Sequence, residues 1–110
     1  MIGRPLTLIG NAQAIVAATV APAPVQVTSS AGSYCAAQSY MLANTGAQTA
    51  YFASDLTSSG ATAKVAVPGA ALVWTVLPGR SMVVGAEANA FWTAITASLT
   101  SACTVTPVGT

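Results

Sequence analysis

Turn-forming residues recur along this chain at intervals too short for typical helices. Glycine, proline and asparagine interrupt the sequence repeatedly, and the segments between them have the length of β-strands. We expect eight or nine strands among these segments, which lie at residues 5–9, 13–20, 25–28, 36–43, 48–53, 63–67, 71–77, 81–84, 90–97 and 103–106. This spacing is typical of a sandwich or barrel, and a chain of 110 residues fits one domain over 1–110.

The apolar residues are suited to strands. They make up 54% of the chain and are largely Ala and Val, while Ser and Thr supply most polar positions. The turn at 44–46 (NTG) predicts a β-hairpin between 36–43 and 48–53. Two Pro-Gly turns, at 68–69 and 78–79, frame a further strand. The sequence therefore predicts an all-β, single-domain β-sandwich.

Charged residues are scarce. They amount to 5% of the chain, where an ordinary soluble domain has about 25%, and they are Arg4, Asp55, Lys64, Arg80 and Glu87. A net charge of +1 gives little repulsion between copies, so we expect the outer surface to be covered by protein, including copies of this chain. Three scattered basic residues favour neither nucleic acid nor an anionic membrane as a partner.

The residues of acid–base catalysis are almost missing. The chain has no His, and its carboxylates, Asp55 and Glu87, would face each other only by coincidence. Lys64 is the one candidate base for a serine nucleophile, but a solvated lysine is the more ordinary interpretation. We therefore expect no enzyme, no catalytic residue, no cofactor and no small-molecule substrate.

Cys35 and Cys103 are the only cysteines, and without histidine they are too few for a zinc site. We expect no metal. The two residues would form one disulfide if they meet, or remain buried thiols, which we favour. The apolar segment 6–25 is interrupted by Gly10, Asn11 and Gln13 and contains Pro22 and Pro24, so we expect neither a membrane span nor a signal peptide.

Aromatic residues are the candidate interface contacts. Adjacent residues of a strand point to opposite faces, so at least one ring in each of two neighbouring pairs must point away from a single core. These pairs are Tyr51 with Phe52 and Phe91 with Trp92. With Trp74 they form a candidate set for contact with a partner, although large aromatics are more often core residues.

Several segments resemble the small β-rich virion proteins found among the head genes of tailed bacteriophages. The resemblance rests on 6–13 (LTLIGNAQ), 42–46 (LANTG) followed by 50–52 (AYF), 77–79 (LPG), and the ending from 92–95 (WTAI) through 105–109 (VTPVG). It spans most of the chain, but its motifs are turns and strand ends. No functional residue is carried over by it.

The resemblance implies a jelly-roll or related sandwich that binds the outside of a capsid as a cement or decoration protein. Its partners would be the major capsid protein and copies of itself, as a dimer or trimer. The expected location is the capsid exterior of the virion, after synthesis in the host cytoplasm. The alternatives are a tail, neck or fibre component, and a carbohydrate-binding or adhesin-like module that uses Trp74 or Trp92.

Overall fold

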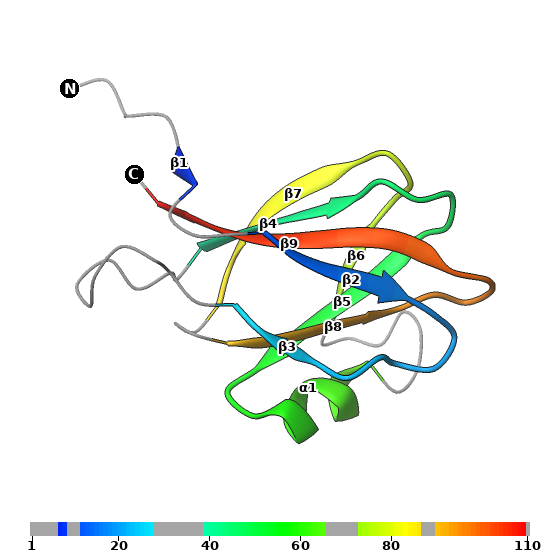
Figure 1. The fold of residues 1–110 in the computed structure, drawn as a ribbon, viewed down its shortest axis with the longest axis horizontal. Coiled ribbons are helices and arrows are strands. Elements are labelled where there is room, and N and C mark those ends of the chain that lie inside the picture. Colours follow the sequence, from blue (N-terminus) through cyan, green and yellow to red (C-terminus); the bar gives the residue numbers. More distant parts are fainter. Residues whose placement is uncertain (1–6, 9–11, 28–38, 66–72, 87–89, 110) are drawn as a thin grey trace.

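The computed structural model describes residues 7–8, 12–27, 39–65, 73–86 and 90–109. Within these residues the chain forms nine strands and one short helix, α1 (Ser58–Lys64), as Figure 1 shows. The strands are β1 (Thr7–Leu8), β2 (Gln13–Ala17), β3 (Val25–Gln26), β4 (Ser39–Asn44), β5 (Ala50–Asp55), β6 (Trp74–Val76), β7 (Ser81–Gly85), β8 (Phe91–Ile95) and β9 (Ser101–Gly109). The prediction of an all-β fold with eight or nine strands is confirmed.

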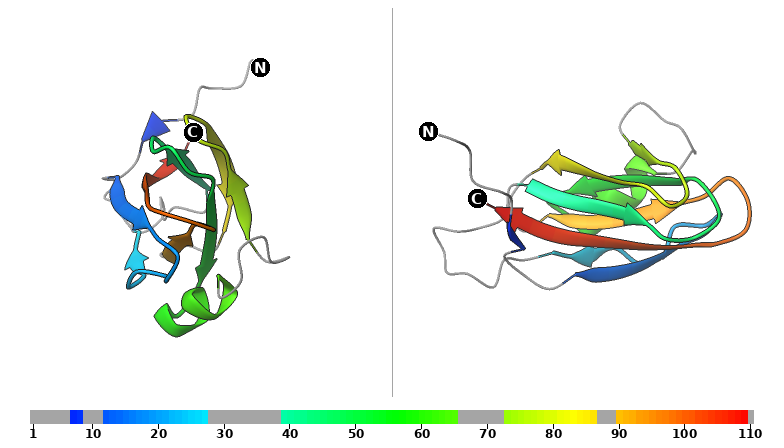
Figure 2. Two further views of the ribbon diagram at one scale, coloured as in Figure 1. Left: turned by 90° about the vertical axis from the view of Figure 1, so that its right-hand side faces the viewer. Right: turned by 90° about the horizontal axis from the view of Figure 1, so that it is seen from above.

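The strands form two antiparallel sheets that pack as a sandwich (Figure 2). The five-stranded sheet has the order β1-β9-β4-β7, with β2 also paired to β9, and the four-stranded sheet has the order β3-β8-β5-β6. Four pairs are nested along the chain: β2 with β9, β3 with β8, β4 with β7, and β5 with β6. Nested pairs distributed over two sheets define a jelly roll, so this prediction is also confirmed.

The predicted hairpin between 36–43 and 48–53 is wrong. β4 pairs with β7 and β9, whereas β5 pairs with β6 and β8 in the other sheet. Residues 45–49 therefore cross between the sheets, which five residues can do because packed sheets lie about 10 Å apart. The crossing lets both strands turn apolar side chains toward one core. If β4 and β5 had paired as a hairpin, both would lie in one sheet and could cover the core from one side only.

The predicted strand at 63–67 is also wrong as far as residue 65. Residues 58–64 form α1, which begins after Thr57, whose Oγ1 accepts a hydrogen bond from the Gly60 N–H at 3.1 Å. This cap satisfies one of the free N–H groups of the first turn, and Ala61 provides a buried contact. A short, capped and alanine-containing helix lacks the long apolar period by which helices are recognised. Residues 66–67 lie outside the described residues.

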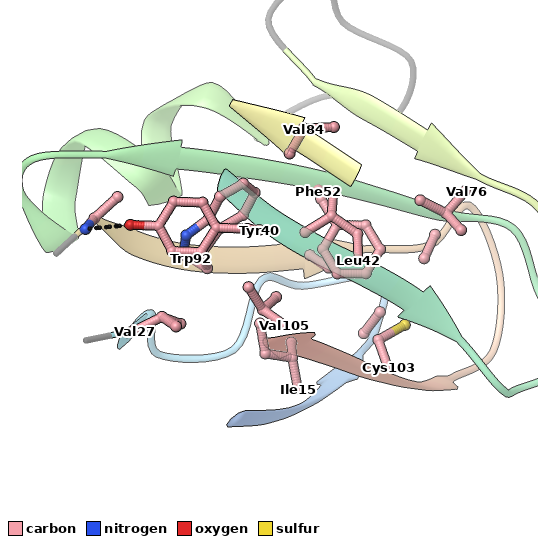
Figure 3. Close-up of a cluster of buried hydrophobic side chains, with 14 residues drawn as sticks. Ile15, Val27, Tyr40, Leu42, Phe52, Val76, Val84, Trp92, Cys103 and Val105 are labelled. Carbon is pink, nitrogen blue, oxygen red and sulfur yellow. Dashed lines mark hydrogen bonds between the residues drawn. The ribbon is translucent and has the colours of Figure 1, made fainter. Parts of the chain in front are cut away.

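The main core lies between the two sheets (Figure 3). Tyr40 and Leu42 of β4 face Phe52 and Trp92 of the opposite sheet, and all four are fully buried. The Tyr40 and Trp92 rings lie 5.0 Å apart between centroids, and the Tyr40 hydroxyl accepts a hydrogen bond from the Ala90 N–H at 3.4 Å. Large rings of this kind each bury about 150–250 Å² and dominate the energy of a small core.

A buried asparagine holds one end of the sandwich together. Asn44, at the end of β4, donates from Nδ2 to the Gln48 carbonyl at 2.6 Å and to the Val76 carbonyl at 3.0 Å. Its Oδ1 accepts from the Gly46 N–H at 3.1 Å and from the Ser101 hydroxyl at 2.6 Å. The side chain thus makes all four of its hydrogen bonds and joins three separate parts of the chain.

Gly46 lies against this network. A Cβ on Gly46 would lie 2.1 Å from Ser101 Oγ and 2.6 Å from the Ala102 backbone nitrogen. Both distances are far below van der Waals contact, and the second involves backbone that cannot rotate away. Glycine is therefore needed here for close approach between the crossing segment and β9.

Candidate protein-interaction surface

The outer surface of the five-stranded sheet carries a continuous set of uncharged side chains, which we call the uncharged face. They come from β2, β4, β7 and β9, and each is exposed or partly exposed. The residues are Ala14, Val16, Met41, Ala43, Ser81, Val83, Ala102 and Thr104. Small and β-branched side chains dominate, so the sheet backbone lies close to the surface.

Strand register places these residues together. Ala43 lies opposite Ser81 on one side and opposite Thr104 on the other, and Thr104 lies opposite Ala14. Residues directly opposite in neighbouring strands share a face, and in β4 the intervening residues Tyr40, Leu42 and Asn44 point into the core. The row therefore crosses four strands without a charge.

The opposite outer surface, on the four-stranded sheet, is covered by the chain itself. Helix α1 packs across β5 and β8, as the ribbon shows below these strands (Figure 1). A second apolar cluster lies beneath it and consists of buried Ala53, Val65 and Ile95 with partly buried Ala21, Tyr51 and Val73. The chain itself therefore buries this cluster, while Leu56 at the start of the helix segment stays exposed.

The ion pair of the described residues lies at the covered surface. Lys64 Nζ lies 3.1 Å from Asp55 Oδ1 and donates to the Ser54 carbonyl at 2.9 Å. Hydrogen bonds from Lys64 and Thr57 hold the pKa of the Asp55 carboxyl below its ordinary value. Lys64, which we interpreted as a solvated lysine, is partly exposed, and its ammonium is also paired and anchors the end of α1 to β5.

Strand β7 is an exposed edge of the five-stranded sheet. Four of its five residues are exposed, including Met82 at 37% and Val83 at 48%, and it pairs only with β4 among the described strands. Natural proteins usually protect such edges with charge, proline or a bulge. β7 has neither a charge nor a proline. The sequence predicted a strand at 81–84 but did not identify it as an exposed edge.

Further exposed apolar residues lie at one end of the sandwich. Val20, Leu77 and Leu99 occupy the connections β2 to β3, β6 to β7 and β8 to β9, which lie at the right of Figure 1. At this end a hydrogen bond from the Thr96 N–H to the Ala18 carbonyl links two connections, and one from the Thr45 N–H to the Ala102 carbonyl links the β4–β5 connection to β9. The exposed Arg80 follows Leu77 in the β6–β7 turn.

The five aromatic residues predicted as candidate contacts fall into two groups. Phe52 and Trp92 are fully buried in the core, so their side chains present no surface to a partner, and that part of the prediction is wrong. Tyr51, Trp74 and Phe91 are partly exposed. The expected alternation within each adjacent pair is confirmed, but the sequence did not show which ring of each pair would face inward.

Trp74 is partly covered by its neighbours. Its ring packs on Trp92 at 5.2 Å between centroids, and its strand β6 lies at the edge of the four-stranded sheet. Tyr51 packs against the second apolar cluster under α1. Both rings therefore support the fold and leave only part of their surface for contact.

Cys103 carries a free thiol and is buried in the main core. Burial raises its pKa to about 11, so the thiol stays protonated at neutral pH, and Sγ donates to the Ser101 carbonyl at 3.6 Å. A protonated, buried thiol behaves as a small hydrophobic side chain. Cys35 lies outside the described residues.

The catalytic candidates are not assembled into a site by the described geometry. Asp55 is paired with Lys64, and Glu87 lies outside the described residues. In the part of the chain that the structure describes, no group of three or more His, Cys, Asp or Glu residues is close enough to hold a metal ion. The described helix is too short to cross a membrane.

No protein-family model, curated protein or solved structure matches this chain.

Proposed function

We propose that this chain is a structural virion protein that binds the outside of a bacteriophage capsid as a cement or decoration protein. The observation that carries the proposal is the uncharged face. Protein interfaces are depleted in charged residues at their centre, and this face offers a row across four strands with none. The bacteriophage setting comes from the sequence resemblance, with which the jelly roll agrees.

The side chains of the uncharged face reduce the entropic cost of binding. Ala loses no rotamer freedom on burial, and short or branched residues such as Ser, Thr and Val lose less than Lys or Glu would. Association must offset the ordering of side chains as well as the loss of overall motion. A sheet face built from these residues can therefore form a stable contact with modest buried area per copy, repeated over many sites of a shell.

Binding through this face should depend weakly on salt. Salt screens attraction between exposed charges, but it acts little on contacts made by apolar and hydroxyl side chains. The partner surface on the major capsid protein should accordingly be uncharged and flat. A strong loss of binding at high salt would point to another surface of the chain.

The test uses purified shells of the major capsid protein and the full chain in a co-sedimentation assay. Ala14→Lys places a charge on the uncharged face and should lower the affinity by at least about tenfold, because a buried unpaired charge is costly. Ala63→Lys is the matched control, since Ala63 is also exposed but lies on α1. Equal binding of both variants, or the absence of the chain from purified virions, would refute the proposal.

The location of the chain within a virion distinguishes this proposal from the other virion roles. A tail, neck or fibre protein would share the same uncharged surface, and density in a virion micrograph would place it away from the capsid. The carbohydrate-binding alternative gains no support from the structure, because Trp92 is buried and Trp74 is partly covered by it.

A further inference from the structure

Strand β7 has the features of a strand that pairs with a second copy of itself. We infer that two copies of this chain associate through antiparallel pairing of their β7 edges, across a twofold axis centred at Val83. The inference stands on the edge strand alone and does not depend on binding to a capsid.

Within the part of the chain that the structure describes, no strand pairs with the free side of β7. Ser81, Met82, Val83 and Gly85 are exposed, and only Val84 is buried. An edge strand offers unpaired N–H and C=O groups, which form a template for another strand unless charge, proline or a bulge blocks it. The five residues contain no proline or charge, and each pairs with β4 in unbroken register from Ser81 to Gly85.

The sequence of β7 is complementary to its own reverse. With Val83 on the axis, Val83 lies opposite its copy, Met82 opposite Val84, and Ser81 opposite Gly85. The branched pair stands at the centre on the outer surface, and the smallest residues meet at the ends. Cross-strand pairs of β-branched residues stabilise a sheet, whereas like charges placed opposite each other destabilise it.

The charge nearest to β7 does not oppose this pairing. Arg80 precedes the strand and would lie opposite Ala86 of the second copy. The two Arg80 residues would then be separated by about 20 Å along the strands, beyond the Debye length of about 8 Å at physiological salt. A strand from another protein could pair with β7 whatever the sequence of β7. A second copy, by contrast, places Val83 opposite Val83 and the small end residues opposite each other.

Pairing across a twofold axis produces a closed dimer. Each copy uses its β7 edge once, so the two five-stranded sheets join into one continuous sheet, and the contact does not propagate into a fibre. A strand of five residues is about 17 Å long, and its edge covers less than the roughly 800 Å² per partner of a standard interface. We therefore expect a weak dimer that is populated at high concentration.

Sedimentation velocity of the full chain over a wide range of concentration tests the dimer. Val83→Lys should weaken association by about tenfold or more, because it places like charges opposite each other. Val16→Lys is the control: Val16 is exposed on the same sheet at 59%, but it lies in β2 near the other edge. Both variants should keep the far-ultraviolet circular dichroism of the parent chain.

A cysteine pair tests the register directly. Val83→Cys should form a disulfide-linked dimer when oxidised glutathione is added, because directly opposite residues in antiparallel strands have Cα atoms about 4.5–5.5 Å apart, within disulfide range. Two protein thiols become one disulfide, and oxidised glutathione becomes two molecules of reduced glutathione. Ser81→Cys would face Gly85 instead of its own copy and should link at least about fivefold less.

The parent chain, which retains Cys35 and Cys103, supplies the background for the linking reaction. The inference is overturned if Val83→Cys links no more than Ser81→Cys. It is also overturned if Val16→Lys rather than Val83→Lys abolishes the dimer, or if the parent chain sediments as a monomer throughout. Shells are absent from these experiments, so their outcome is separate from that of the capsid-binding assay.

Discussion

The two outer surfaces of this sandwich differ in how far the chain itself covers their apolar side chains. The four-stranded sheet is covered by α1, which seals a cluster of buried Ala53, Val65 and Ile95 and brings Lys64 to Asp55. Among the described residues, no helix covers the uncharged face of the five-stranded sheet, which exposes small residues with Val16 and Val83 among them. On one side the chain therefore buries a cluster of apolar residues itself, and on the other side it leaves small uncharged residues exposed.

The largest expected effect concerns Asn44, which fixes the crossing from one sheet to the other. Asn44→Leu keeps the branched shape of the side chain but leaves the Val76 carbonyl and the Ser101 hydroxyl without this partner in a buried site. We expect a loss of about 3 kcal/mol or more in the free energy of unfolding, measured by urea denaturation.

Thr45→Val is the control for the Asn44 variant. It removes the hydrogen bond from Thr45 Oγ1 to the Ala102 carbonyl, which is exposed and 3.2 Å long, so its loss should cost less than about 1 kcal/mol. Equal losses for Asn44→Leu and Thr45→Val would show that the asparagine network does not hold the two sheets together.

The same substitution on the two surfaces tests their comparison directly. Val65→Ala removes a fully buried side chain from the cluster under α1 and should destabilise the fold by about 2 kcal/mol. Val83→Ala removes a side chain that is 48% exposed and should change stability by less than about 0.5 kcal/mol in the monomer. Similar unfolding free energies for both variants would contradict the contrast between a covered and an uncovered surface.

A smaller, pH-dependent effect belongs to the covered surface. The pKa of Asp55 is lower in the folded chain than its ordinary value of 3.8, because Lys64 and Thr57 donate to its carboxylate. The folded state therefore binds a proton at Asp55 less readily than the unfolded state does. The ionised carboxylate stabilises the fold at pH values above its ordinary pKa, and this stabilisation is lost as the pH falls through the lowered pKa of the folded state.

Thermal unfolding of the parent chain and of Asp55→Asn between about pH 2 and pH 7 measures this contribution. We expect the parent to have the higher midpoint at neutral pH and the difference to shrink toward acid. Added salt should also reduce it, since the pair is partly exposed. A difference that is unchanged at pH 2 would mean that the carboxylate charge is not responsible.

The positions of the strands could be predicted from the sequence, but their partners could not. Turn residues bound each strand locally, so β5 and β7 were found within a few residues of their observed ends. Pairing depends on distant contacts, and the NTG turn at 44–46 fits a crossing between sheets as well as a hairpin. Asn44 was identified as a turn residue, although its buried hydrogen bonds are formed with residues far along the chain.

The candidate surface was predicted only in outline. Scarce charge indicated that some face would meet protein, but the side that α1 covers depends on a short helix that has no clear periodic pattern. The aromatic pairs misdirected the choice of residues, since alternation cannot tell which of Phe91 and Trp92 points inward. Alanine, serine and valine carry no individual signal, and they define a face only when the register aligns them.

Hydroxyl-radical footprinting of the chain on purified virions, compared with the free chain, tests the central claim most directly. Val16 on the uncharged face and Leu56 beside α1 are equally accessible in the free molecule, at 59% and 61%. The account predicts that oxidation of Val16 and Met41 falls sharply in the assembled state while that of Leu56 does not. Equal oxidation of Val16 in both states, with protection found at Leu56 instead, would contradict it.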